Sequence, residues 1–212
     1  MRKDTKPATQ PPAKKKAATS ARTSKINVEF TVLEGPPGSR LTKAFHIADD
    51  GKIVKDGTPV FSSGTAEARQ IRKLSEIEDI IESLGSGQCL ATGLFDSPRC
   101  DIVTAKDLDA KAEETGTRSR SKKHMQQPSL GLVLFDHDVS EYTPEQLRCS
   151  TPAELMEKLI TAVPELQDIA WSGTTSCSHG ITNQATEAPY PGGGGLHAYA
   201  VIKDVPLGEF QR

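Results

Sequence analysis

Long apolar runs are missing from this sequence, and aromatic side chains are few. Aromatic residues make up 5% of the 212 residues, and hydrophobic residues as a whole make up 35%. A helix that crosses a bilayer needs about 20 consecutive apolar residues, so a transmembrane helix is excluded. The N-terminal segment also lacks the apolar core of a secretory signal peptide.

Paired cysteine motifs are missing as well. None of the four cysteines lies in a CxxC pair or in a zinc-finger spacing. We therefore expect free thiols in a reducing compartment. The four positions are Cys89, Cys100, Cys149 and Cys177.

Acidic residues are almost absent from the start of the chain. Residues 1–25 carry eight of the 26 Lys and Arg residues of the chain and one of its 28 acidic residues, Asp4. Residues 26–212 therefore carry 18 basic and 27 acidic residues, a net charge of −9. We interpret residues 1–25 as a basic disordered tail and residues 26–212 as one domain. The tail is either a solubilising leader or a non-specific contact to nucleic-acid phosphates.

Apolar alternation and turn residues predict strands mixed with helices. Strands are expected over residues 26–33, 89–95, 168–173 and 196–202, with a β-hairpin around Asp50 and Gly51. The short apolar segment 131–136 predicts a buried central strand. The polar stretch 105–129 is expected to form an exposed helix and loop or a flexible connection. The order predicts an α+β fold, with a mixed or antiparallel sheet and flanking helices.

Two helices carry N-terminal capping signals. One covers residues 74–85, where Ser75 and Glu78 are expected to form a capping box. The other follows Thr151, which we expect to pair with Glu154 in the same way. The apolar stripe of the second helix consists of Met156, Leu159, Ile160 and Val163.

Two aspartates directly follow the apolar segment in LVLFDHDVS, residues 132–140. Alternation along a strand puts Asp136 and Asp138 on one face and His137 on the other, where we expect it to be packed. Two carboxylates on one face repel each other unless a cation joins them, and Mg²⁺ or Mn²⁺ prefers such oxygen ligands. The pair therefore predicts a metal site for phosphoryl or nucleotidyl transfer. The alternative is two exposed aspartates after a strand.

A second group of candidate residues surrounds a long polar loop. Ser172 and Gly173 can offer a hydroxyl and a closely approached backbone N–H to a phosphate. His197 follows Gly195 at the start of the next strand and can donate to a triphosphate oxygen. Taken alone, His197 is better explained as a half-buried strand residue, and the glycines as a flexible hairpin. His179 is a rival to His197, but the loop does not hold it in place as a strand would.

The order of these pieces resembles the archaeo-eukaryotic primases and primase-polymerases. In that family an acidic D-x-D at a strand end is followed by a Ser-Gly stretch and then by G-x-H on the next strand. Residues 136–138, 172–173 and 195–197 match these motifs. The enlarged loop between the last two is most similar to the primase domains of phages and plasmids. The match covers residues 130–204, and no motif of the family lies in residues 26–129.

The resemblance implies a primase-polymerase-like catalytic domain in DNA replication. It implies that Asp136 and Asp138 are catalytic and hold Mg²⁺ or Mn²⁺. It further implies that His197 and Ser172 bind the triphosphate of the incoming nucleotide, with Gly173 and Gly195 beside it. Implied partners are a single-stranded DNA template, nucleoside triphosphates and a replicative helicase. The implied location is the cytoplasm of a bacterium or of a phage-infected host cell.

The third acidic motif of that family has no clear match here. Asp204 lies about 20 Å from His197 at roughly 3.3 Å per residue along the strand, which is too far to share a metal. Glu209 is the remaining candidate. We therefore expect a fragment that ends before the third acid, with weak or no activity.

A basic run, TRSRSKKH over residues 117–124, precedes the D-x-D strand. Arg118, Arg120, Lys122 and Lys123 could contact phosphates of the template or triphosphate, or could form a solvated loop. A replication-associated DNA-binding module that uses this run and the tail is the main alternative to an enzyme. A metal-dependent phosphoesterase or nuclease is a weaker alternative, because the additional His or Asp ligands of such enzymes are missing.

Overall fold

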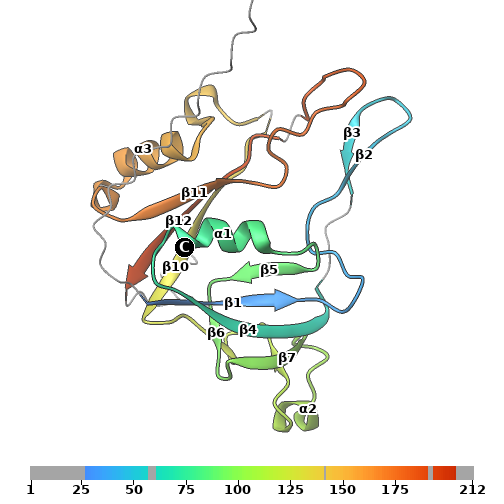
Figure 1. Cartoon of the computed structure of the whole chain (residues 1–212), viewed down its shortest axis with the longest axis vertical. Helices are drawn as coiled ribbons and strands as arrows, with labels where there is room; N and C mark the ends of the chain where they lie inside the picture. The colour runs from blue at the N-terminus through green and yellow to red at the C-terminus, as the bar shows by residue number, and fades with distance from the viewer. Residues whose placement is uncertain (1–26, 57–60, 141, 191–192, 204–212) are drawn as a thin grey trace, which may run out of the picture.

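The computed structural model describes residues 27–56, 61–140, 142–190 and 193–203. Their secondary structure is α+β, with several sheets and few helices, as the sequence predicts (Figure 1). The helices are α1 (Glu76–Ser83), α2 (Ala110–Glu114) and α3 (Pro152–Ala162), with 3₁₀ turns at Glu145–Leu147 and Pro164–Leu166. The strands are β1 (Val28–Glu34), β2 (Phe45–Ile47), β3 (Ile53–Lys55), β4 (Ser63–Ile71), β5 (Gln88–Ala91), β6 (Leu94–Phe95), β7 (Arg99–Val103), β8 (Arg118–Ser119), β9 (Met125–Gln126), β10 (Leu130–His137), β11 (Trp171–Thr175) and β12 (Leu196–Lys203).

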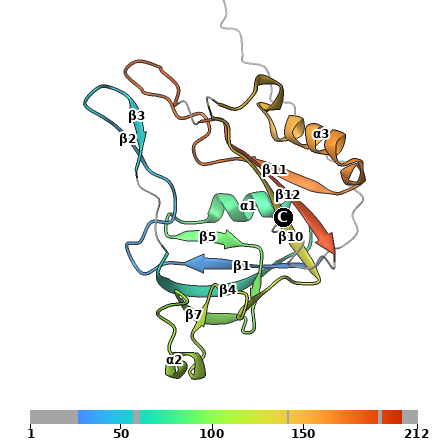
Figure 2. The ribbon, with the colours of Figure 1, turned by 180° about the vertical axis from the view of Figure 1, so that it is seen from behind.

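The larger sheet has the strand order β5-β1-β4-β7-β8. Its pairs are antiparallel except for the parallel pair of β7 with β8. Strand β1 is buried over most of its length, because its apolar side chains contact both α1 and the second sheet. Val28, Phe30 and Ile77 of this half pack with Leu132 and Tyr199 of the other half in one hydrophobic cluster. This cluster joins the two sheets, with α1 at their junction (Figure 2).

The smaller sheet has the order β10-β12-β11, and both pairs are antiparallel. The prediction that residues 131–136 form a central strand is wrong, because β12 pairs with both neighbours and β10 is left at an edge. One face of this sheet is covered by α3, whose Leu155 and Met156 pack against Leu196 and Ala198. The opposite face is directed toward α1 and β1, so the candidate residues on that face lie on the side of the sheet away from α3.

The two predicted capping boxes have different outcomes. At α3, the Thr151 hydroxyl accepts a hydrogen bond from the Glu154 N–H at 3.2 Å, and Glu154 accepts from the Ser150 N–H at 2.7 Å. At α1, Ser75 adopts a helical backbone conformation and its side chain makes no capping hydrogen bond, so that prediction is wrong. The Glu78 carboxylate contacts a distant strand instead, as described below.

Most of the predicted elements occur close to where the sequence places them. The hairpin around Gly51 forms, and Gly51 has the positive φ of +79° that favours glycine in a tight turn. The strand expected over 89–95 is split into β5 and β6, and the stretch 105–129 contains α2, β8 and β9. In the apolar stripe of α3, Met156 is buried, whereas Val163 ends the helix and is 43% exposed. Strands β4 and β7 have no counterpart in the prediction.

Several expectations concern residues outside the described ranges. The basic tail over residues 1–25 and the candidate acids Asp204 and Glu209 belong to this group. The four cysteines are all described and are free thiols, as expected. Across the described part of the chain, no helix combines the length and the hydropathy needed to cross a membrane.

Candidate functional site

The smaller sheet brings Asp136 and His197 together. Antiparallel pairing sets Asp136 of β10 directly opposite His197 of β12, and Thr174 of β11 lies opposite His197 on the other side. Directly paired residues share a face of the sheet, so the three side chains form a row across it. The His197 Nε2 atom is 3.3 Å from Asp136 Oδ1. Residues separated by 61 positions in the sequence thus form an acid–imidazole pair.

A second row continues this face beyond the end of β10. Asp138 follows β10 directly, and the Ser176 N–H donates a hydrogen bond to the Gly195 carbonyl at 2.9 Å. A Cβ placed on Gly195 would lie 2.4 Å from Ser176 Oγ and 3.0 Å from Asp138 Oδ1. Both polar side chains therefore occupy the space that any other residue at position 195 would fill. The rows together contain two carboxylates, an imidazole and two hydroxyls.

His137 points away from this group, as the strand alternation predicts. It pairs with Leu196, whose side chain is buried on the α3 side of the sheet. The His137 Nε2 atom is buried and has no hydrogen-bond partner among the described residues. It takes no part in the Asp136 and His197 group.

Ser172 lies on the same face but has a partner within the fold. Its side chain is 7% exposed, and its hydroxyl donates to a carboxylate oxygen of Glu78 on α1. This contact links β11 to α1 across 94 positions of sequence. The hydroxyl therefore stabilises the contact between α1 and β11.

Gly173 and Gly195 have different neighbours. Gly173 lies on the opposite face of β11, where an added Cβ would be 2.4 Å from Pro152 Cβ. Its small size lets the first turn of α3 approach the sheet. Gly195 instead makes room for Asp138 and Ser176, so only Gly195 of the two contacts the candidate group.

Tyr199 supports His197 from within the protein. The ring is 5% exposed, and its centroid lies 6.3 Å from that of His197 in an edge-to-face arrangement. Burial raises the pKa of the Tyr199 phenol, and the Asp136 charge adds to this effect. The phenol is therefore neutral beside the imidazole at physiological pH.

The donor atoms of this face suit a hard divalent cation. Among the residues that the structure describes, no three His, Cys, Asp or Glu side chains are close enough to form a complete metal site. Mg²⁺, however, is commonly held by one or two carboxylates, with water and substrate phosphates as the remaining ligands. Asp136 and Asp138 provide carboxylates of this kind, and the buried Thr174 hydroxyl oxygen has no hydrogen-bond partner among the described residues. The oxygen ligands on this face are of the type that Mg²⁺ and Mn²⁺ prefer.

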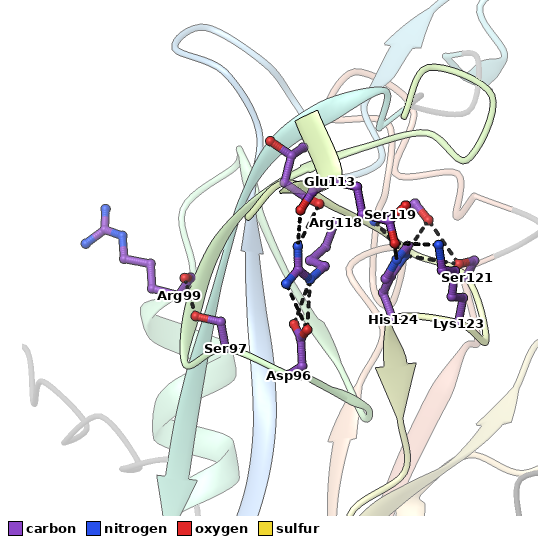
Figure 3. Close-up of polar contacts among 10 residues, drawn as sticks. Asp96, Ser97, Arg99, Glu113, Arg118, Ser119, Ser121, Lys123 and His124 are labelled. Atoms are coloured by element: carbon purple, nitrogen blue, oxygen red, sulfur yellow. Dashed lines mark hydrogen bonds and ion pairs between the residues drawn. The ribbon is translucent and has the colours of Figure 1, made fainter. Parts of the chain in front are cut away.

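Much of the basic run is engaged within the fold, as Figure 3 shows. The Arg118 guanidinium donates from Nε and Nη2 to the Asp96 carboxylate at 2.8 Å and also to two backbone carbonyls. Lys123 forms an ion pair with Glu113, and the Arg120 guanidinium lies 5.2 Å from the centroid of the Phe61 ring. Lys122 is exposed.

The run is also remote from the aspartates. It precedes the start of β10, whereas Asp136 and Asp138 are at the other end of this strand, whose eight residues span about 25 Å. Figure 1 shows α2, next to the run, at the opposite end of the molecule from the β2–β3 hairpin. The structure therefore does not bring the run together with the aspartates, although the run lies only a few residues before β10 in the sequence.

Sequence reasoning missed two hydroxyl residues of the site. Thr174 and Ser176 follow Ser172 at intervals of two, so the strand alternation that placed the aspartates could also have placed them. Glu78 could not have been found in this way, because its contact depends on how α1 packs. His179, the rival of His197, is exposed in the loop.

Comparisons with models of protein families, with curated proteins and with solved structures gave no match to this chain.

Proposed function

We propose that the chain is a primase-polymerase-like nucleotidyltransferase domain, which joins nucleotides on a single-stranded DNA template in phage or plasmid replication. The observation that supports this most directly is the pairing of Asp136 with His197. Two motifs that resemble those of one enzyme family, separated in the sequence by α3, β11 and a long loop, meet on one face of one sheet.

Each residue of this face would have a separate role in the reaction. Asp136 and Asp138 would hold Mg²⁺ or Mn²⁺, which when bound neutralises phosphate charge and activates the attacking hydroxyl. His197 would donate a hydrogen bond to a phosphate oxygen, with Tyr199 holding the imidazole in place. Gly195 has no side chain, so it would let Asp138 and Ser176 lie close to the backbone at the start of β12.

The reaction would be a substitution at phosphorus. The 3′-oxygen of one nucleotide forms a bond to the α-phosphorus of the next, and the bond from that phosphorus to the β-phosphate oxygen breaks. The proton of the 3′-hydroxyl passes to solvent water, and pyrophosphate is the leaving group and second product. Positioning and charge neutralisation account for most of the catalysis in reactions of this class.

The test is formation of dinucleotides or primers on single-stranded DNA, with Mg²⁺ or Mn²⁺ and both ribo- and deoxynucleoside triphosphates. Because the third acidic motif has no match here, we expect weak, metal-dependent product from the wild type and at least a hundredfold less from Asp136→Asn combined with Asp138→Asn. Asp168→Asn is the matched control, because Asp168 is an exposed aspartate outside the site. The control should retain wild-type activity.

The other outcomes separate the alternative functions. DNA binding that survives the double aspartate change, with no incorporation under any metal, would identify a non-enzymatic DNA-binding module. Strand nicking without nucleotides would identify a nuclease instead. Product that persists in the double variant would rule out these carboxylates as the catalytic pair.

A further inference from the structure

A small polar hollow lies beside Asp138, between the β2–β3 hairpin and the long loop before β12. Its volume is about 180 Å³. Both views show the hairpin and the loop side by side (Figure 1 and Figure 2). The side chains that line it include Lys43, Phe45 and Lys55 on the hairpin side and Asp138, Ser178 and Tyr190 on the other.

The hairpin is held against the loop by two contacts. The Phe45 and Tyr190 rings meet edge to face, with their centroids 5.0 Å apart. Nearer the tip, the Asn183 side-chain amide donates to the Gly51 carbonyl at 2.9 Å, and Asn183 is 3% exposed. These contacts fix the hairpin lysines relative to Asp138, although more than 80 residues separate them in the sequence.

The other basic groups of this hairpin have carboxylate partners. Arg40 and His46 both contact Asp56, and Lys52 pairs with Asp50 near the tip. Within the described ranges, Lys43 and Lys55 form no ion pair, and both line the hollow. Two ammonium groups at one small hollow repel each other, and an anion between them would relieve that repulsion.

The charge pattern of the hollow indicates the kind of anion. Asp138, which also lines the hollow, repels a simple anion but attracts a divalent cation, whereas the lysines attract phosphate oxygens. A polyphosphate that carries a divalent cation satisfies both sides at once. Ser178 and Tyr190 also line the hollow, and the Ser178 hydroxyl is hydrogen-bonded to that of Ser176 at 2.8 Å.

The volume limits how much of a ligand can enter. Pockets that enclose a whole drug-sized ligand are larger, about 300–1,000 Å³. The hollow therefore suits a polyphosphate chain and not a complete nucleotide.

We propose that this hollow binds the terminal phosphates of the incoming nucleoside triphosphate, with Lys43 and Lys55 holding the phosphate oxygens. The identity of the ligand rests on the proposed function. The β2–β3 hairpin, for which the sequence carries no family motif, becomes part of the nucleotide site. The α-phosphate then lies toward Asp136 and His197, and the terminal phosphates lie toward the hairpin.

The experiment measures binding of inorganic tripolyphosphate, and of nucleoside mono- and triphosphates, with Mn²⁺, by titration calorimetry. Lys43→Ala and Lys55→Ala should each weaken tripolyphosphate and nucleoside triphosphate binding about tenfold, because each removes a charge-assisted hydrogen bond. Monophosphate binding should change little. Lys55→Arg should retain most of the affinity, and thermal unfolding of each variant checks that it is folded.

Lys52→Ala is the matched control, because Lys52 belongs to the same hairpin but pairs with Asp50 outside the hollow. The proposal is overturned if the wild type does not bind tripolyphosphate, if both hollow variants bind it like the wild type, or if Lys52→Ala loses as much affinity. Primer synthesis distinguishes the two proposals. Loss of polyphosphate binding in the lysine variants of a protein that never polymerises supports the hollow but not the proposed function. Polymerisation that is unchanged in the lysine variants supports the proposed function and contradicts the hollow as a phosphate site.

Discussion

Asp136 and His197 lie opposite each other on neighbouring antiparallel strands, with 3.3 Å between Oδ1 and Nε2. The loop between β11 and β12 can vary in length without altering this pair, because the ladder between β10 and β12 sets it. The pair defines the face on which Asp138, Thr174 and Ser176 also lie.

His197→Ala should lower the affinity for a nucleoside triphosphate in the presence of Mn²⁺ by about tenfold, because it removes a hydrogen-bond donor to phosphate. Binding of a labelled nucleotide to the 212-residue chain measures this affinity directly. Binding also requires fewer residues of the site than catalysis does. His179→Ala is the control, since His179 is exposed in the loop. Equal affinities for the wild type and His197→Ala would remove His197 from the nucleotide site.

Gly195→Ala should damage the site more than the fold. The new methyl group would lie 2.4 Å from Ser176 Oγ and 3.0 Å from Asp138 Oδ1, so both side chains must move. We expect a loss of about 1–3 kcal/mol in the free energy of unfolding and a loss of Mn²⁺-dependent nucleotide binding. Chemical denaturation and nucleotide titration measure the two effects.

Gly85→Ala is the matched control for that change, because the nearest atom to its added methyl group is a flexible side-chain oxygen at 3.7 Å. Nucleotide binding by Gly195→Ala that equals binding by this control would show that Asp138 does not need its present position.

Ser172 and Glu78 should behave as one energetic unit. Ser172→Ala and Glu78→Ala should each lower the free energy of unfolding by about 1–2 kcal/mol, because each removes a partly buried hydrogen bond that involves a carboxylate. The double variant should lose little more than either single variant. A denaturation cycle with the four proteins gives the coupling energy, and a value near zero would contradict this role.

The same variants test the role that the family resemblance implies for Ser172. A loss of nucleotide binding in Ser172→Ala but not in Glu78→Ala would assign the hydroxyl to the triphosphate. Equal binding by both variants would leave Ser172 with the structural contact alone.

The Asp96 and Arg118 pair should make stability depend on pH in acid. Hydrogen bonds from Arg118 hold the pKa of Asp96 below its ordinary value of 3.8. A carboxylate with a lowered folded-state pKa stabilises the fold above its ordinary pKa, and this contribution is lost as the pH falls through the lowered value. Arg118→Gln should therefore destabilise the protein near neutrality, by less and less as the pH falls below 3.8.

Denaturant midpoints measured from about pH 2 to 7 check this dependence. The effect should be modest, because the Asp96 side chain is 54% exposed. Arg99→Gln is the control, since Figure 3 shows the Arg99 side chain pointing away from the cluster. A constant difference between the wild type and Arg118→Gln over this range would contradict the prediction.

Local patterns predicted the elements that depend on neighbouring residues. The hairpin at Gly51 and the cap of α3 at Thr151 are encoded within a few residues, by turn chemistry and by a capping side chain. Even the sharing of one face by Asp136 and Asp138 follows from strand alternation, which is a local property. The same patterns gave no sign of β4 or β7, whose pairing depends on distant strands.

The tertiary structure determined which residues far apart in the sequence come into contact. The sequence could not determine that β12 is the central strand of its sheet, that Glu78 turns to Ser172, or that Arg118 is held by Asp96. Each result depends on which surfaces meet when apolar area is buried, and a polar group then bonds whatever lies within reach. The sequence by itself determined the chemical groups and their local faces. Only packing decided that Asp136 meets His197 and that a lysine-bearing hairpin lies beside Asp138, because strand register and hairpin docking are properties of the whole chain.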